Sequence, residues 1–122
     1  ESLLDKIIHA NKKNDFAMGA FLETPVTSQS TLIGIARYVE ENAPGEAEFS
    51  ISVRDDFHHE GVGSNLMRSM LQVAKENSYQ NVHGYVMSDN HEMLTLMSHL
   101  GAKCQRDPED ATMMIVTFIL KK

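Results

Sequence analysis

The sequence has 122 residues, a formal net charge of −6 and a single cysteine, Cys104. This length predicts one domain over residues 1–122, which buries enough surface to fold without a disulfide or a structural metal. The acidic charge argues against a nucleic-acid partner, because such proteins gather Lys and Arg against phosphates. No apolar run reaches the roughly 20 residues of a membrane span, and a lone cysteine fits a reducing compartment. We therefore expect a cytoplasmic domain without a membrane partner.

The first half of the chain is predicted to form a helix followed by three strands. Residues 2–13 have the apolar spacing of a short amphipathic helix. Because the chain starts at Glu1, directly before this pattern, we expect further chain upstream. The strands are expected over residues 16–23, 31–39 and 46–53. Along the third strand, Phe49, Ile51 and Val53 alternate with Glu48, Ser50 and Ser52. One face of that strand is therefore apolar, and the other either meets solvent or lines a cleft.

A glycine loop follows the third strand and precedes a helix. Gly61 and Gly63 let the backbone turn tightly and leave N–H groups open at the positive end of that helix, which makes a cradle for a phosphate. The helix has an apolar face made of Val62, Leu66, Met67, Met70, Leu71, Val73 and Ala74. The Gly-Lys step of a Walker A loop is absent, and Leu66 stands where a dinucleotide fingerprint needs its third glycine. No zinc site is predicted, since neither His-Glu pair extends to HExxH.

The second half of the chain predicts a strand, a helix and two further strands. Residues 81–87 form the strand, and residues 88–90 start a helix with Asp89 and Glu92 as a capping box and Gly101 as its end. A weak strand and a polar turn lie within residues 102–111, and residues 112–120 are apolar on both faces, which predicts a buried final strand. The class is α/β or α+β with a mixed sheet.

This order resembles the Gcn5-related N-acetyltransferase (GNAT) superfamily, whose loop of the form (Q/R)xxGxG binds the pyrophosphate of acetyl-CoA. The loop here is HHEGVG, and Asn90 opens a second helix that ends at Gly101. The stretches AEFSISVRDD and VMSDNHEMLTLMSHLGA are similar to the acetyltransferase domains of bacterial protein lysine acetyltransferases. The resemblance implies a twisted mixed sheet flanked by helices. It runs from Asp15 onward, so the family's first strand and helix are expected to be missing.

The resemblance also implies a reaction, in which an amine attacks the thioester of acetyl-CoA directly and Glu48 acts as general base. The favoured acceptor is a protein lysine, in some relatives that of an acyl-CoA synthetase. A small amine is a second enzymatic reading, and a non-catalytic acyl-CoA sensor is the alternative from another class. Glu46 competes with Glu48 for the role of base. Met97 replaces the tyrosine that often serves as general acid in the family. Either the reaction needs less help from an acid, or Ser88 or Tyr85 takes the place of that tyrosine.

The residues expected at acetyl-CoA are drawn from the third strand, the glycine loop and the second helix. They are Ile51, Ser52, Val53, His58, His59, Glu60, Gly61, Val62, Gly63, Ser64, Asn90, Met93 and Met97. The backbone of residues 51–53 would pair with the pantetheine arm, and the Val53 N–H would face the thioester oxygen. Because no Lys or Arg lies between Asp55 and Met67, His58 or His59 is left to supply positive charge. We expect modest affinity that increases as the pH falls from about 8 to about 6.

Overall fold

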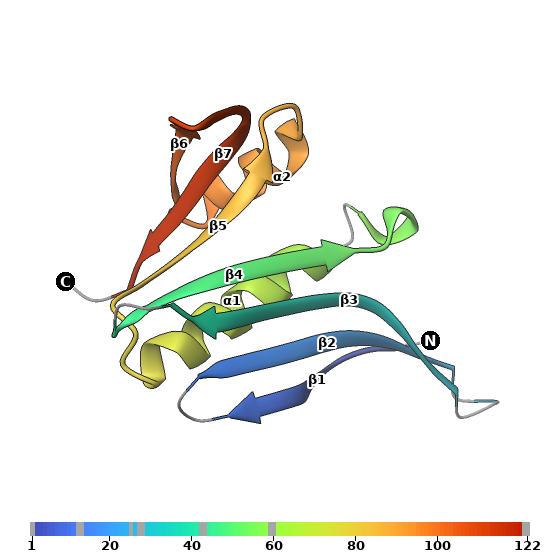
Figure 1. Ribbon diagram of the computed structural model, residues 1–122. Coiled ribbons are helices and arrows are strands. Elements are labelled where there is room, and N and C mark those ends of the chain that lie inside the picture. Colours follow the sequence, from blue (N-terminus) through green and yellow to red (C-terminus); the bar gives the residue numbers. More distant parts are fainter. Residues whose placement is uncertain are drawn as a thin grey trace.

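The computed structural model describes residues 2–11, 14–24, 26, 29–41, 44–58 and 61–120. It contains one seven-stranded sheet with the strand order β1-β2-β3-β4-β5-β7-β6 (Figure 1). The elements, in chain order, are β1 (Ser2–Asn11), β2 (Asp15–Thr24), β3 (Gln29–Glu40), β4 (Glu46–Val53), the 3-10 turn η1 (Asp55–Phe57), α1 (Val62–Glu76), β5 (Asn81–Met87), α2 (His91–His99), β6 (Lys103–Asp107) and β7 (Asp110–Ile119). The mixed α/β class expected from the sequence is confirmed.

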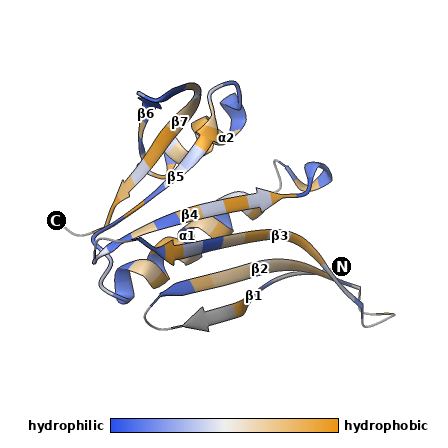
Figure 2. Cartoon of the chain, in the orientation of Figure 1, coloured by the Kyte–Doolittle hydropathy of each residue, from blue (hydrophilic) through white to orange (hydrophobic). Residues whose placement is uncertain are grey.

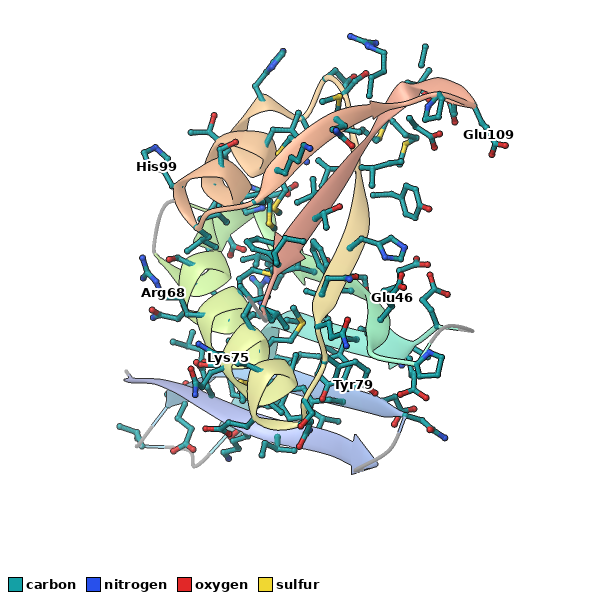
Figure 3. The ribbon with its side chains drawn as sticks, turned by 90° about the vertical axis from the view of Figure 1, so that its left-hand side faces the viewer. Glu46, Arg68, Lys75, Tyr79, His99 and Glu109 are labelled. Carbon is teal, nitrogen blue, oxygen red and sulfur yellow. The ribbon has the colours of Figure 1, made fainter. Side chains whose placement is uncertain are left out.

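Helix α1 forms the centre of the core. Its expected apolar face is buried against β2, β3 and β4, through Val62, Leu66, Met67, Met70 and Ala74. Both helices lie on the same side of the sheet, and none of the described residues forms a helix over the opposite face, which we call the open face (Figure 3). No helix among the described residues is long and apolar enough to cross a bilayer.

The prediction of a helix over residues 2–13 is wrong. Residues Ser2–Asn11 form β1, which pairs antiparallel with β2 and has a bulge between Ile7 and His9. The apolar doublets of this segment fit a helical spacing, but the free edge of β2 offers a ladder of backbone hydrogen bonds that decides the outcome. Ile7 and Ile8 are both exposed, so no core pattern opposed the strand.

The final strand is less buried than its composition predicts. β7 is hydrophobic along most of its length (Figure 2), yet Val116 and Phe118 are its only buried described residues, and Ile119 is 67% exposed. The reason is that the helices cover only one face of the sheet. The apolar side chains on the other face of β7 therefore remain accessible.

The sheet is split between β4 and β5, its one parallel pair of strands. These strands are in register only at Glu46–Asn81, Ala47–Val82 and Glu48–His83. Beyond that last pair no further pairing is found among the described residues, and the strands diverge in a V (Figure 1). The split separates β1–β4 from β5–β7 and leaves one edge of β4 without a neighbouring strand.

Candidate active site

The unpaired edge of β4 presents backbone groups to the split. The Arg54 N–H donates to the Ile33 carbonyl of β3 at 2.8 Å, which fixes the direction of alternation along β4. Because successive residues of a strand direct their backbone groups to opposite sides, Ile51 and Val53 direct theirs toward the split. The Val53 carbonyl already accepts a hydrogen bond from His58 Nε2 at 2.9 Å. The other backbone groups of Ile51 and Val53 can therefore form hydrogen bonds with an extended ligand in the split.

A cavity of about 670 Å³ lies where the end of β4 meets the starts of α1 and α2. This volume is typical of small-molecule sites. The cavity is lined by Val53, Phe57, His58, Gly61, Gly63, Ser64, Asn90, His91, Glu92, Met93, Thr95, Leu96 and His99. The lining is largely apolar and, within the described part of the chain, includes neither Lys nor Arg.

The start of α1 gives this cavity its polar floor. Gly61 is the N-cap with φ of 81°, a left-handed conformation that favours glycine, and no side chain caps the helix. The first N–H groups of a helix have no partner within it, and the first turn of α1 contains no acidic residue. A Cβ atom at Gly63 would approach Leu96 Cδ2 to 3.2 Å, so a larger residue here would push the Leu96 side chain back by a few tenths of an ångström. The geometry suits an anionic group at the helix N-terminus.

His58 links the glycine loop to α2. Its Nδ1 lies 3.0 Å from Glu92 Oε1, while its Nε2 donates to Val53 and is 3.7 Å from Asp55 Oδ1. Both ring nitrogens therefore face oxygen atoms. His58 lines the cavity beside the start of α1, and two carboxylates lie close to its ring.

Most of the residues expected at acetyl-CoA lie around this cavity. Those that line it are Val53, His58, Gly61, Gly63, Ser64, Asn90 and Met93. Ile51 lies beside the loop, while Ser52 points to the open face of the sheet. Val62 and Met97 are buried in the core, where only their backbone atoms remain available to a ligand. His59 and Glu60 lie outside the described residues.

Two features of α2 differ from the expectation. The helix is capped by Asn90, whose Oδ1 accepts a hydrogen bond from the Met93 N–H at 3.1 Å, and not by Asp89. His91 and His99, which the sequence analysis did not single out, also line the cavity. Their spacing of two helical turns was the available signal, since it places both on one face.

The open face of the sheet carries a second group of side chains, at the point where the split begins. Glu48 is exposed on this face and pairs in register with His83, directly before the strands diverge. Glu41, which follows β3, forms an ion pair with His83, with 3.1 Å between Glu41 Oε1 and His83 Nε2. One donor or acceptor atom from each of these three residues lies within 4.8 Å of the others. Glu46, the competing base, is partly buried on the same face (Figure 3).

A smaller cavity of about 250 Å³ adjoins Glu48 on this open face. It is lined by Arg37, Val39, Glu41, Glu48, Phe49 and Ser50. Tyr85, one of the two residues left open as general acid, is 47% exposed, and its ring centroid lies 5.8 Å from that of His83. Ser88 follows β5 and donates its backbone N–H to Thr112. The geometry leaves both possibilities for the acid open.

Comparisons with known proteins show the family to which this fold belongs. The family described as Acetyltransferase (GNAT) domain matches residues 1–103, so the chain belongs to the GNAT family. An acetyltransferase of Pseudomonas aeruginosa is 28% identical over 93% of this chain and 60% of its own length. The acetyltransferase Pat of Mycolicibacterium smegmatis is 34% identical over 62% of this chain and 23% of its own.

Solved structures show the same fold. The GNAT domain of the Streptomyces lividans protein PAT matches with a TM-score of 0.78 and 23% identity, over 92% of this chain and 64% of that one. A PaiA N-acetyltransferase from Thermoplasma acidophilum in complex with coenzyme A matches with a TM-score of 0.72 and 20% identity, over 87% of this chain and 61% of that one. The chain thus spans less than two thirds of these proteins.

Proposed function

We propose that this domain transfers the acetyl group of acetyl-CoA to an amine by direct attack in a ternary complex. One observation carries the proposal: the uncapped glycine loop of α1 leads into the unpaired edge of β4, and that edge leads to Glu48. An anion site, a ladder for an extended arm and a carboxylate base therefore follow one another along a single path.

The donor would bind from the cavity side of the split. The pyrophosphate fits the N–H groups at the start of α1, and the pantetheine arm pairs with β4 as an added strand. Val53 is about 17 Å along the strand from Glu48, at roughly 3.3 Å per residue. The Ile51 N–H, closer to Glu48, therefore takes the position of oxyanion donor in place of Val53, which serves the arm.

The acceptor would approach from the open face. At neutral pH a lysine amine needs about 4.6 kcal/mol to lose its proton, so a neighbouring carboxylate accelerates the attack. The exposure of Glu48 where the split begins supports this role. The resemblance to protein lysine acetyltransferases favours a protein lysine over a small amine as the acceptor.

The test is a free-thiol release assay with acetyl-CoA and either a candidate acyl-CoA synthetase or a panel of small amines. Wild type is compared with Glu48→Gln, and mass spectrometry of the products separates the two classes of acceptor. Thiol release that depends on an amine and on Glu48 supports the proposal. Full turnover by Glu48→Gln together with no stabilisation by acetyl-CoA would end it.

A non-catalytic acyl-CoA sensor is the second candidate, because one observation favours it. Met97, at the position where the family often has a tyrosine acid, is fully buried in the core, so α2 offers no hydroxyl to the leaving thiolate there. A thiol leaves readily without strong acid help, with an ordinary pKa of about 8.5, so this observation does not remove catalysis. Stoichiometric CoA binding without thiol release against any amine would favour the sensor.

A further inference from the structure

The side chains around Glu48 form a chain of proton acceptors that begins at the split and ends at the rim of the open face. Glu48 comes from β4, His83 from β5, and Glu41 from the segment that follows β3. The β4–β5 register holds Glu48 and His83 side by side, and the Glu41 N–H donates to the Glu46 carbonyl at 2.8 Å. The backbone therefore holds all three residues in place.

The ion pair between His83 and Glu41 positions the imidazole ring. His83 Nε2 lies 3.1 Å from Glu41 Oε1. A neutral imidazole carries a hydrogen on one ring nitrogen only, so its other nitrogen can accept a proton. The His83 side chain is only 20% exposed, and the T-shaped contact with Tyr85 restrains it further.

We propose that His83, positioned by Glu41, relays the amine proton from Glu48 to solvent. The relay rests on the proposed function. A lysine ammonium loses one proton before it attacks and a second one as the C–N bond forms and the C–S bond breaks, while CoA leaves as a thiolate. Each proton passes in turn to Glu48, then to the ring nitrogen of His83 that carries no hydrogen, and the imidazolium releases it to water. Glu48 returns to its carboxylate form while the acceptor still covers it.

The charged surroundings of His83 suit a transient cation. Glu41 follows β3, Glu46 and Glu48 lie on the same face of β4, and Tyr85 is two residues further along β5. Two positive side chains belong to neighbouring strands. Arg37 lines the cavity beside Glu48, and Lys103 is two strands away, in register with Thr117, the partner of His83. The two carboxylates of Glu41 and Glu48 lie beside the imidazole whose protonated form completes the relay.

His83→Gln tests the relay in the intact domain, with thiol release followed across pH. We expect kcat to fall about tenfold, less than the 10²–10⁴ of a lost general base, with the KM for acetyl-CoA unchanged. Imidazole added to the buffer should restore part of the rate, because it replaces the missing proton carrier. Glu41→Gln should alter the pH profile in the same direction with a smaller loss, and Glu41→Asp should recover it.

The control is Glu76→Gln, which removes an exposed carboxylate of α1 that accepts from Gln72 and should leave the rate unchanged. Wild-type turnover with unchanged kcat and pH profile in His83→Gln would overturn the relay alone, as would a loss that imidazole does not relieve. No thiol release by wild type with any amine would overturn the proposed function and the relay together. If His83→Gln melts at a much lower temperature, the Glu41 variants decide.

Discussion

The two sides of the β4–β5 split are lined by different chemical groups. On the cavity side, backbone N–H groups, glycines and apolar side chains surround about 670 Å³, with histidines as the only described basic side chains in the lining. On the open side, Glu41, Glu48 and His83 from three separate segments surround the point where the split begins. One side suits an anion held by amides, and the other suits a cationic amine. In the proposed reaction, the split therefore separates the acetyl donor from the amine acceptor by charge.

The largest expected effect breaks the open side alone. Glu48→Gln removes the base but not its volume, so we expect kcat/KM to fall by about 10²–10³. The Kd for acetyl-CoA, measured by calorimetry, should change less than twofold, because Glu48 lies outside the cavity lining. An equal loss of binding and turnover would mean that the two sides are not separate.

Glu46→Gln is the matched control for that experiment. Glu46 lies on the same face of β4, but it is at the closed end of the split, in register with Asn81. Its substitution should leave the rate nearly unchanged. If Glu46→Gln loses the rate and Glu48→Gln keeps it, the base is Glu46, and the acceptor binds two residues further along β4 from the point where the strands diverge.

The next effect breaks the cavity side. Gly61→Ala forces a left-handed φ on alanine, which costs about 1–2 kcal/mol and favours a loop that turns its N–H groups away from the cavity. We expect the Kd for acetyl-CoA to rise about tenfold, which corresponds to about 1.4 kcal/mol. The kcat at saturating acetyl-CoA should stay close to that of wild type.

Gly101→Ala is the control that separates the effect of backbone strain on stability from a direct effect on acetyl-CoA binding. Gly101 has φ of 101° after α2, and, as at Gly61, an added Cβ would meet nothing within 4 Å. This variant should lose similar stability in denaturant unfolding but keep its affinity for acetyl-CoA. Weakened binding in both variants to the same degree would assign the effect to general destabilisation.

A smaller effect concerns the charge of the cavity. Histidine side chains gain charge as the pH falls from about 8 to about 6, so CoA binding should tighten about fivefold, since one charge a few ångströms from a phosphate contributes about 1 kcal/mol in a water-filled site. His58→Gln should remove this pH dependence, because His58 is beside the glycine loop. Calorimetry at both pH values measures it.

Two comparisons sharpen that result. Dephospho-CoA serves as a second ligand, because a terminal phosphate itself titrates near pH 6. His91→Gln and His99→Gln make the same substitution at the two cavity histidines of α2, and the pH dependence of their CoA binding is measured in the same way. If these variants lose the pH dependence and His58→Gln keeps it, the phosphates contact α2 and not the loop.

The contrast between the two sides also explains what the sequence could predict. The cavity side is encoded locally, since Gly61, Gly63 and Asn90 each stand at the start of the helix that they shape. The Glu41–His83 contact joins residues far apart in the chain and depends on the register of β4 and β5, which no local pattern sets. The first strand was missed for the same reason. Its helical spacing was overridden by pairing with β2, a partner that lies outside the segment.

The smallest effect on activity is expected at Tyr79, a buried residue that contacts the end of β3. Its hydroxyl donates to Glu40 Oε1 at 3.1 Å and so anchors the end of β3 next to Glu41. Burial raises the pKa of Tyr79 well above its usual range, and the hydrogen bond to Glu40 and the charge of Glu40 raise it further. Tyr79→Phe should cost about 1 kcal/mol of stability at neutral pH and change kcat less than threefold.

The pH dependence of that cost follows from the sign of the shift. Because the folded state holds the phenol proton more tightly than the unfolded chain, the stabilisation is fully present below about pH 10 and is lost as the pH rises above it. In denaturant titrations between about pH 10 and 11, the free energy of unfolding should therefore fall less with pH for Tyr79→Phe than for wild type. Tyr38, whose pKa is raised first by burial, contributes the remaining alkaline loss, so Tyr38→Phe is the matched comparison. An identical alkaline decline in wild type and Tyr79→Phe would show that folding does not raise the pKa of Tyr79.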